Sequence, residues 1–163
     1  MSKLIDEGEL PEFPYFYIRR IRWGDTDTAK IGYTGVFPQI GMEAIEDFSL
    51  DVLGENWYEN TIDKGRGNPF VHLSIDFHAS ITPHDTLYVG VWIEKIGRTS
   101  LSYLLEGHIS PSGKKSFTAR YTCVFVNSST RKPIEIPSNL RTKAEAYQSA
   151  CKAVPGPGEF KLP

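Results

Sequence analysis

Cysteine is scarce in this sequence, and long apolar runs are missing altogether. Cys123 and Cys151 are the two cysteines among 163 residues, too few and too scattered for a disulfide framework or a zinc site. No stretch approaches the ~18 apolar residues that a membrane-spanning helix needs, and the N-terminus lacks the apolar core of a secretory signal. We therefore expect a cytoplasmic protein with no membrane partner.

A large excess of either charge is also missing. The sequence has 18 Lys and Arg residues against 20 Asp and Glu residues, which gives a formal net charge of −2 at pH 7. Such a surface does not attract nucleic acid or an anionic membrane as a whole, so we expect no nucleic-acid partner. An anionic ligand would have to be held by a local group of cations.

What the sequence does contain is the composition of one globular domain. Hydrophobic residues make up 40% and charged residues 23%, as in ordinary folded proteins, and the length corresponds to about one domain. We divide the chain into an acidic N-terminal arm at 1–14, a domain at 15–152 and a C-terminal tail at 153–163. The composition VPGPGEFKLP predicts that this tail is loose.

The spacing of apolar residues defines the expected elements. The run YFYIRRIRW is rich in aromatic and β-branched residues and predicts a strand. After Gly35, apolar residues recur at the spacing of an amphipathic helix, which Gly54 is placed to end. Period-two alternation later in the chain predicts antiparallel strands, each with one face better buried. The expected order is a strand at 15–23, a helix at 35–53, a loop at 55–69, strands at 70–81, 86–97, 99–109 and 115–127, and a short helix at 138–150.

This order predicts an α+β fold in which an antiparallel sheet of about five strands curls around one long central helix. One helix covers one face of such a sheet, so the other face needs a neighbour. We therefore expect self-association, and Trp92 and Leu104 at outward-facing positions agree with it.

The stretch WGDTDTAKIGYTG, between the first strand and the long helix, contains Asp25 and Asp27. A calcium loop is not supported, because Ala29 and Lys30 occupy its fifth and sixth positions and Val36 stands where a bidentate Glu is required. Turn formation explains one of the two acids well. The loop also leads to a helix N-terminus, where unpaired N–H groups favour an oxyanion. A carboxylate beside such donors is what acyl transfer needs.

At these residues the sequence resembles a known family. The stretch IRWGDTDTAKIGYTGVFPQIGMEAIED resembles the opening of the hotdog-fold acyl-CoA thioesterases of the 4-hydroxybenzoyl-CoA thioesterase type. The segment VHLSIDFHASITPHDTLYVGVWIEKIGRTSLSYLLEG is similar to the family's later strands. The resemblance spans about residues 15–127. It implies a hotdog fold and hydrolysis of a small acyl-CoA to the free acid and CoA, with an aromatic, 4-hydroxybenzoyl-like acyl group as one option.

The resemblance also implies roles for single residues. Asp27 falls on the catalytic carboxylate, which acts as nucleophile or as general base, and Asp25 becomes the acid that supports the turn. The thioester carbonyl would be held by a backbone N–H within Tyr33, Thr34 and Gly35, with Thr34 the preferred donor and Tyr33 lining the acyl pocket. No metal and no cofactor is implied, because CoA belongs to the substrate.

One position departs from the family's pattern. The usual glycine after D-x-D-x-x is Lys30 here. If this position requires a positive φ, the lysine carries strain of about 1 kcal/mol; otherwise the loop has a different shape. The charge of Lys30 is alternatively available to a CoA phosphate.

CoA carries several phosphate charges, so the site needs cations near its mouth. Arg98, in IGRTS between two strands, lies where the family's hairpin often reaches the nucleotide, and Arg98 with Ser100 is the pair that we prefer. Arg66 and the pair Lys114 and Lys115 are further candidates. The family also implies a homo-oligomer, a dimer or a tetramer, with sites at the subunit interfaces.

Three alternatives stay open. Glu43 competes with Asp27, because other hotdog thioesterases place the catalytic acid on the central helix; its ordinary role would be a salt-bridged helix face. A hotdog hydratase or dehydratase would need a catalytic His, and the helix start has none. A non-catalytic acyl-CoA-binding or structural hotdog module is expected if Asp27 is buried and satisfied by turn N–H groups, with no pocket beside it. His78 is expected to be structural.

Overall fold

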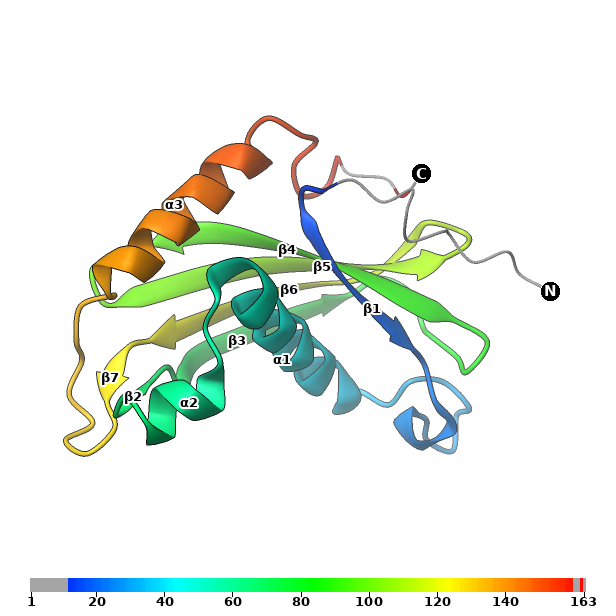
Figure 1. The fold of residues 1–163 in the computed structure, drawn as a ribbon. Helices are drawn as coiled ribbons and strands as arrows, with labels where there is room; N and C mark the ends of the chain where they lie inside the picture. The colour runs from blue at the N-terminus through cyan, green and yellow to red at the C-terminus, as the bar shows by residue number, and fades with distance from the viewer. Residues whose placement is uncertain (1–11, 160–161, 163) are drawn as a thin grey trace.

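Five antiparallel strands form a sheet that curls around one long helix in the computed structural model, which describes residues 12–159 and 162 (Figure 1). The strands are β1 (Tyr15–Arg20), β3 (Phe70–Phe77), β4 (Thr86–Ile96), β5 (Ser100–Ser110) and β6 (Lys114–Val124). Their order across the sheet is β1-β4-β5-β6-β3. The predicted fold class is confirmed. Residues 1–11 of the expected arm, and 160, 161 and 163 of the tail, lie outside the described residues.

The central helix α1 spans Val36–Phe48 and continues as a π-helical turn over Ser49–Leu53. Its apolar stripe is buried against the sheet because the side chains recur at helical spacing on one face. Gly54 ends the helix with φ +70, a left-handed conformation that glycine adopts without steric cost. The helix predicted at 35–53 is therefore confirmed. No helix in the described part of the chain is long and apolar enough to span a membrane.

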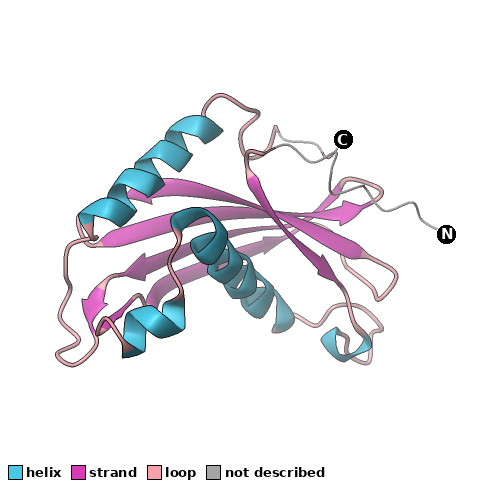
Figure 2. Ribbon diagram, in the orientation of Figure 1, coloured by secondary structure: helices cyan, strands magenta, loops and turns pink. Residues whose placement is uncertain are grey.

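Helix α3 (Ser138–Cys151) lies along β4 (Figure 2). Strand β1 pairs with β4 only as far as Val91, so the later part of β4 has backbone groups without a neighbouring strand. Tyr147 donates its hydroxyl to the Val91 carbonyl, and Gln148 Nε2 donates to the Ile93 carbonyl at 3.0 Å. The helix thus takes the place of β1 and blunts a strand edge. The helix predicted at 138–150 is confirmed.

Strand β4 is buried on both faces, whereas alternation predicted one better-buried face. Trp92 and Leu104, on the outward side of the sheet, are only 5% and 7% exposed. They line a cavity of about 470 Å³ together with tail residues Val154, Gly156 and Pro157. Both side chains are therefore buried within this chain, and Trp92 and Leu104 no longer argue for self-association.

The segment predicted as a loop at 55–69 contains a short helix, α2 (Trp57–Ile62), and a short strand, β2 (Arg66–Gly67), which pairs with β7 (Val126–Asn127). Asn56 Oδ1 accepts hydrogen bonds from the N–H groups of Tyr58 and Glu59 at 2.9 and 3.2 Å. Asn followed three residues later by Glu is a helix-start pattern. That signal was present in the sequence and was masked by the polar composition around it.

Candidate active site

The loop at 21–35 joins β1 to α1 and carries the D-x-D sequence. Ile21 N–H donates to the Asp85 carbonyl at 3.0 Å, and Gly32 N–H donates to the Ile81 carbonyl at 2.7 Å. Both sides of the loop are thereby tied to the segment that precedes β4. The first predicted strand ends at Arg20 rather than at residue 23, because Trp23–Asp25 form a 3₁₀ turn.

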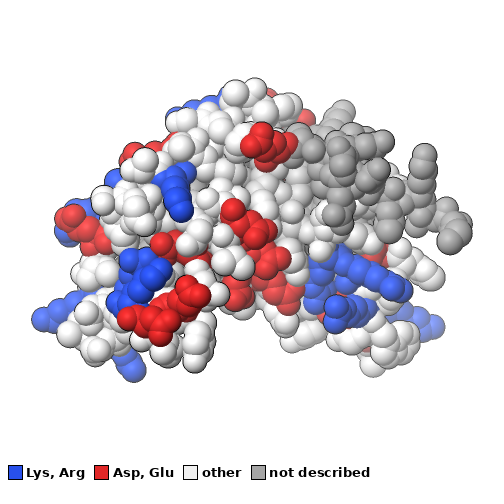
Figure 3. All heavy atoms as spheres, in the orientation of Figure 1, with Lys and Arg blue, Asp and Glu red and all other residues white. Residues whose placement is uncertain are grey.

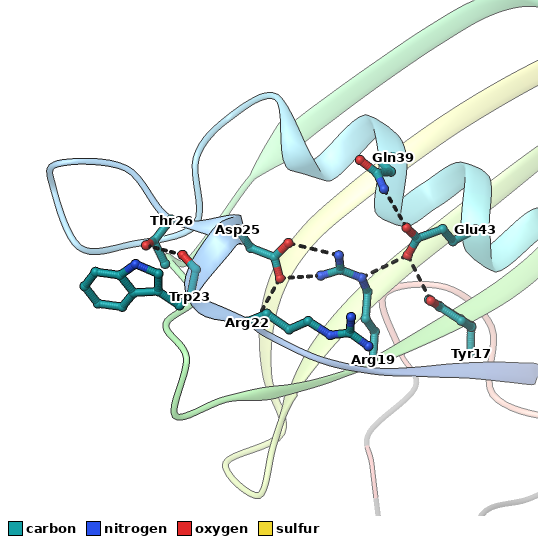
Figure 4. Close-up of polar contacts among 8 residues, drawn as sticks. All are labelled: Tyr17, Arg19, Arg22, Trp23, Asp25, Thr26, Gln39 and Glu43. Carbon is teal, nitrogen blue, oxygen red and sulfur yellow. Dashed lines mark hydrogen bonds and ion pairs between the residues drawn. The ribbon is translucent and has the colours of Figure 1, made fainter.

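Asp25 is buried and organises this loop. The Arg19 guanidinium donates to both carboxylate oxygens, Nη1 to Oδ2 at 2.8 Å and Nη2 to Oδ1 at 3.0 Å, and Arg22 N–H donates to Oδ2 at 2.8 Å (Figure 4). The hydrogen bond from Arg19 holds the pKa of Asp25 below its usual value. Tyr33 N–H also donates to the Asp25 carbonyl at 2.9 Å. These contacts agree with the supporting role predicted for Asp25.

Arg19 also connects this loop to the central helix. Its Nε donates to Glu43 Oε2 at 2.9 Å, and the same oxygen accepts the Tyr17 hydroxyl at 2.9 Å (Figure 4). Gln39 Nε2 donates to the other oxygen of Glu43 at 2.9 Å. Three donors therefore occupy the Glu43 carboxylate. This geometry favours the ordinary role expected for Glu43, a salt bridge on the helix face, over the role of catalytic acid.

Asp27 is exposed at the tip of the loop. Its Oδ1 accepts Ala29 N–H at 2.8 Å, and its backbone carbonyl accepts Lys30 N–H at 2.9 Å, which makes a tight turn. Its second carboxylate oxygen has no hydrogen-bond partner among the described residues. Lys30 has φ +64, so the loop keeps a conformation that favours glycine, and the first of the two alternatives for Lys30 is confirmed.

Tyr33, Thr34 and Gly35 lead into the first turn of α1. The carbonyls of Tyr33 and Thr34 accept the N–H groups of Val36 and Phe37. No acceptor for the N–H groups of Thr34 and Gly35 lies in the part of the chain that the structure describes. A Cβ on Gly35 would meet the Tyr33 hydroxyl at 1.9 Å, so a side chain here would displace the tyrosine. The two free donors agree with the predicted carbonyl-binding role.

A cavity of about 320 Å³ lies beside these donors. It is lined by the end of the loop, the start of α1 and the segment that follows β3. The rings of Phe37 and Phe77 meet edge to face, with centroids 4.9 Å apart. His78 lines the cavity and contacts Thr118 Oγ1 through Nε2 at 3.0 Å, in line with a structural role. The lining residues are Ile31, Gly32, Thr34, Phe37, Phe77, His78, Ala79 and Ser80.

Arg98 and Ser100 lie far from this loop within one chain. Arg20 pairs with Thr86 at the start of β4, whereas Arg98 follows its end. At about 3.3 Å per residue, the eleven residues of β4 put roughly 33 Å between the two places. Arg98 also pairs with Glu135 at 3.2 Å. Asp27, Tyr33, Thr34 and Gly35 thus belong to one loop, of which Thr34 lines the cavity, whereas Arg98 and Ser100 lie at the opposite end of β4.

The other cations considered from the sequence are mostly engaged elsewhere. Arg66 pairs with buried Glu55 at 2.6 Å, and Lys115 pairs with buried Glu106 at 2.8 Å. Sequence reasoning missed Arg19, although three arginines stand close together in YFYIRRIRW. Among the described residues, no group of three or more His, Cys, Asp or Glu side chains is placed to hold a metal ion.

Comparison with known proteins agrees with the expected family. The model of the thioesterase-like superfamily matches residues 21–144. A 1,4-dihydroxy-2-naphthoyl-CoA hydrolase from Nostoc punctiforme is 26% identical over 126 residues, which cover 77% of this chain and 83% of that protein.

Two solved structures are also similar. A thioesterase superfamily protein from Jannaschia sp. CCS1 is 31% identical, with a TM-score of 0.77, and the match covers 90% of this chain and 96% of that one. A 1,4-dihydroxy-2-naphthoyl-CoA thioesterase from Synechocystis is 27% identical, with a TM-score of 0.74, and the match covers 80% of this chain and 94% of that one.

The family match includes the D-x-D loop, α1 and the strands β3 to β6. The Nostoc and Synechocystis relatives are named as hydrolases of an acyl-CoA thioester, so the prediction of a thioester hydrolase is confirmed at the level of the family. The resemblance to the hotdog acyl-CoA thioesterases is confirmed with it. A sheet curled around a central helix, a D-x-D loop before that helix and these matches lead to one conclusion: the chain belongs to the thioesterase-like superfamily and has its hotdog fold.

Proposed function

We propose that this protein hydrolyses the thioester of an acyl-CoA and that Asp27 is the catalytic carboxylate. One observation carries the proposal: a single short loop presents an exposed carboxylate with one free oxygen and, a few residues later, two N–H groups without acceptors among the described residues. Donors at a helix start stabilise the oxyanion of a tetrahedral intermediate. We assign this role to Thr34 and Gly35.

Two routes are chemically consistent with this arrangement. As a nucleophile, the Asp27 carboxylate adds to the thioester carbon, the C–S bond breaks, and water then hydrolyses the mixed anhydride. As a general base, Asp27 takes a proton from water, the hydroxide adds to the carbonyl, and the departing thiolate takes up a proton. Both routes consume one water and release the acid and the thiol of CoA.

For the acyl group we propose an aromatic ring. Phe37 and Phe77 line the cavity beside the helix start. Tyr33, proposed from the sequence to line the acyl pocket, is not among the lining residues and is 52% exposed. Aromatic walls favour a ring through edge-to-face or stacked contacts. The Nostoc and Synechocystis relatives are named for a naphthoyl-CoA, which is also aromatic.

We also propose that the protein is a homo-oligomer. Among the described strands, β3 has only β6 beside it, and its side chains Val71, Leu73 and Phe77 are 62%, 40% and 51% exposed. An open edge with apolar side chains is a surface for strand pairing with a second copy. Arg98 and Ser100 stay proposed substrate-binding residues for a site that a second subunit completes.

A cytoplasmic location remains a proposal as well. Cys123 and Cys151 are both free and buried thiols. Unpaired cysteines are the rule in reducing compartments.

The alternative activities have less support. A non-catalytic module was expected to bury Asp27, whereas Asp27 is exposed. Its Oδ1 does accept a turn N–H, and the cavity near the loop is lined by Ile31, Gly32 and Thr34 rather than by Asp27. A hydratase would pair a histidine with an acid, but His78 contacts Thr118 instead.

The test is release of free thiol from a panel of aromatic and aliphatic acyl-CoAs. We expect Asp27→Asn to lower kcat by at least about 100-fold, and Glu43→Gln to keep a larger share of the rate. Asp63→Asn, which changes an exposed aspartate at the end of α2, is the matched control. If Asp27→Asn keeps most of the rate, Asp27 is not the catalytic acid. If no acyl-CoA releases thiol, the thioesterase proposal is wrong.

A further inference from the structure

Two arginines beside the Asp27 loop have charges that no described residue neutralises. Arg19 is engaged by Asp25 and Glu43, whereas Arg20 and Arg22, close to it at the end of β1, are not. Arg20 and Arg22 are exposed, and neither has a carboxylate partner among the described residues. Figure 3 shows Lys and Arg side chains gathered over the end of β1.

Trp23 follows these arginines and is 82% exposed, which makes it the most exposed of the large apolar side chains described. An indole this open to water is unusual for a residue type that is well buried on average. The turn that carries it is well defined, because the Trp23 carbonyl accepts both the N–H and the hydroxyl of Thr26, at 3.2 and 2.8 Å.

Two hollows adjoin this group. One, of about 480 Å³, is lined by Arg20, Ile21, Arg22, Trp23 and Pro83. A second, of about 320 Å³, has Arg20 and Arg22 in its wall together with Tyr17, Ile18, Arg19, Gln39 and Glu43. Arg20 and Arg22 line both hollows, and Trp23 lines the first; these three side chains are the surface considered below.

We propose that Arg20, Arg22 and Trp23 bind the nucleotide end of the CoA substrate, an inference that rests on the proposed function. Guanidinium groups match phosphate oxygens in charge and geometry, and an exposed indole offers a flat face on which a purine stacks. The ligand class is therefore a purine nucleotide with several phosphates, and the occupant is the phosphorylated adenosine of CoA.

The position of this surface agrees with its role. Trp23 and Asp27 belong to the same short loop, and Thr26, the residue next to Asp27, is bonded to Trp23. A nucleotide held here can place its extended arm and thioester near Asp27 of the same chain. Within one chain Arg98, the cation preferred from the sequence, lies about one strand length away and is paired with Glu135, so it could reach substrate at this loop only from a second subunit.

The experiment compares an acyl-CoA with the matching acyl-pantetheine, which has the same thioester but no nucleotide. We expect the double variant Arg20→Gln/Arg22→Gln, and separately Trp23→Ala, to raise KM for the acyl-CoA at least about tenfold. The ratio of kcat/KM for acyl-CoA to that for acyl-pantetheine should fall by the same factor. Arg131→Gln, which removes an exposed positive charge elsewhere, is the matched control. Thermal unfolding of each variant checks that the fold is kept.

Arg98→Gln is the competing arm of the same experiment. If it lowers the ratio and the Arg20/Arg22 variant does not, the nucleotide lies at the hairpin and the inference is overturned. If wild type hydrolyses neither thioester, the proposed function fails, and titration of free CoA by tryptophan fluorescence then tests the surface alone. Saturable quenching that disappears in Trp23→Ala supports the site; its absence, or its persistence in that variant, overturns the site.

Discussion

Asp25 and Glu106 are both buried carboxylates held by cations, yet they lie in regions of opposite character. Asp25 accepts two hydrogen bonds from Arg19 and one from Arg22 N–H. Glu106, on the outward side of β5, is 2% exposed and contacts Lys115 Nζ at 2.8 Å and His108 Nε2 at 3.4 Å. Burial alone would raise the pKa of Glu106, but hydrogen bonds from His108, Lys115 and the N–H of Gly158 lower it to about 2.

The difference lies in what surrounds each carboxylate. Glu106 is 2% exposed and accepts a hydrogen bond from the N–H of Gly158, whereas Trp23 beside Asp25 is 82% exposed. The left-handed backbone positions near Glu106 are Gly113 and Gly158, but the one near Asp25 is Lys30. A buried ion pair therefore does not by itself mark a functional site. Exposed charged groups without a partner, and a non-glycine residue held at positive φ beside the ion pair, are better indicators of a functional site.

The largest effect is expected where Arg19 is removed. Arg19→Gln leaves Asp25 and Glu43 without their shared guanidinium, and losing one partner of a largely buried pair costs about 3 kcal/mol of unfolding free energy. Thiol release should also fall at least about tenfold, because the loop loses its link to α1. Urea denaturation and the assay measure both. The control is Arg120→Gln, whose partner Glu94 is half exposed; a loss below about 1 kcal/mol for Arg19→Gln would contradict the prediction.

The second-largest effect is expected when the pH is lowered, which should reduce the free energy of unfolding through Glu106. The folded pKa of Glu106 is about 2, below its usual 4.5, so the stabilisation is present above pH 4.5 and is lost as the pH falls toward 2. A difference of this size corresponds to about 3 kcal/mol. Asp25 acts with the same sign. Denaturation curves between pH 7 and 2 should show a shallower acid loss for Glu106→Gln than for wild type; equal slopes would refute the assignment.

A smaller gain is expected at Lys30. Lys30→Gly relieves the left-handed strain at φ +64, and the entropy cost of glycine offsets part of it, which leaves a net gain of up to about 1 kcal/mol. Gly113→Lys is the reverse change, at φ +69 near Glu106. It should lower the free energy of unfolding by about as much. Thermal unfolding compares the two. Destabilisation by Lys30→Gly would mean that the lysine side chain itself stabilises the loop.

The smallest effect is expected at an ion pair that belongs to neither region. Arg98 and Glu135 have side chains that are 77% and 70% exposed, and exposed pairs contribute little. Arg98→Gln should therefore change the free energy of unfolding by less than about 0.5 kcal/mol in urea denaturation. A larger loss would show that Arg98 is engaged in an assembly of subunits.

The order of the elements could be predicted because it depends on local spacing. Helical periodicity after Gly35 and two-residue alternation in the later segments led to α1 and to β3 to β6 with small errors at their ends. Helix α2 was missed although Asn56 and Glu59 mark its start. The hydrogen bond between Gly158 and Glu106 could not be predicted, because nothing local to the tail points to a residue about 50 positions earlier.

The sequence by itself determined the fold class, the D-x-D loop and its place before the central helix, since these follow from residue order and spacing. Only the tertiary structure decided which groups in that region are engaged. It pairs Arg19 with Asp25 and also with Glu43, which is 24 residues after Arg19. It leaves the side chains of Arg20, Arg22 and Trp23 exposed to solvent. It also puts Arg98 at the far end of β4. Partners of this kind depend on strand register and on the crossing of helix and sheet, which bring distant residues together and which no short stretch of sequence encodes.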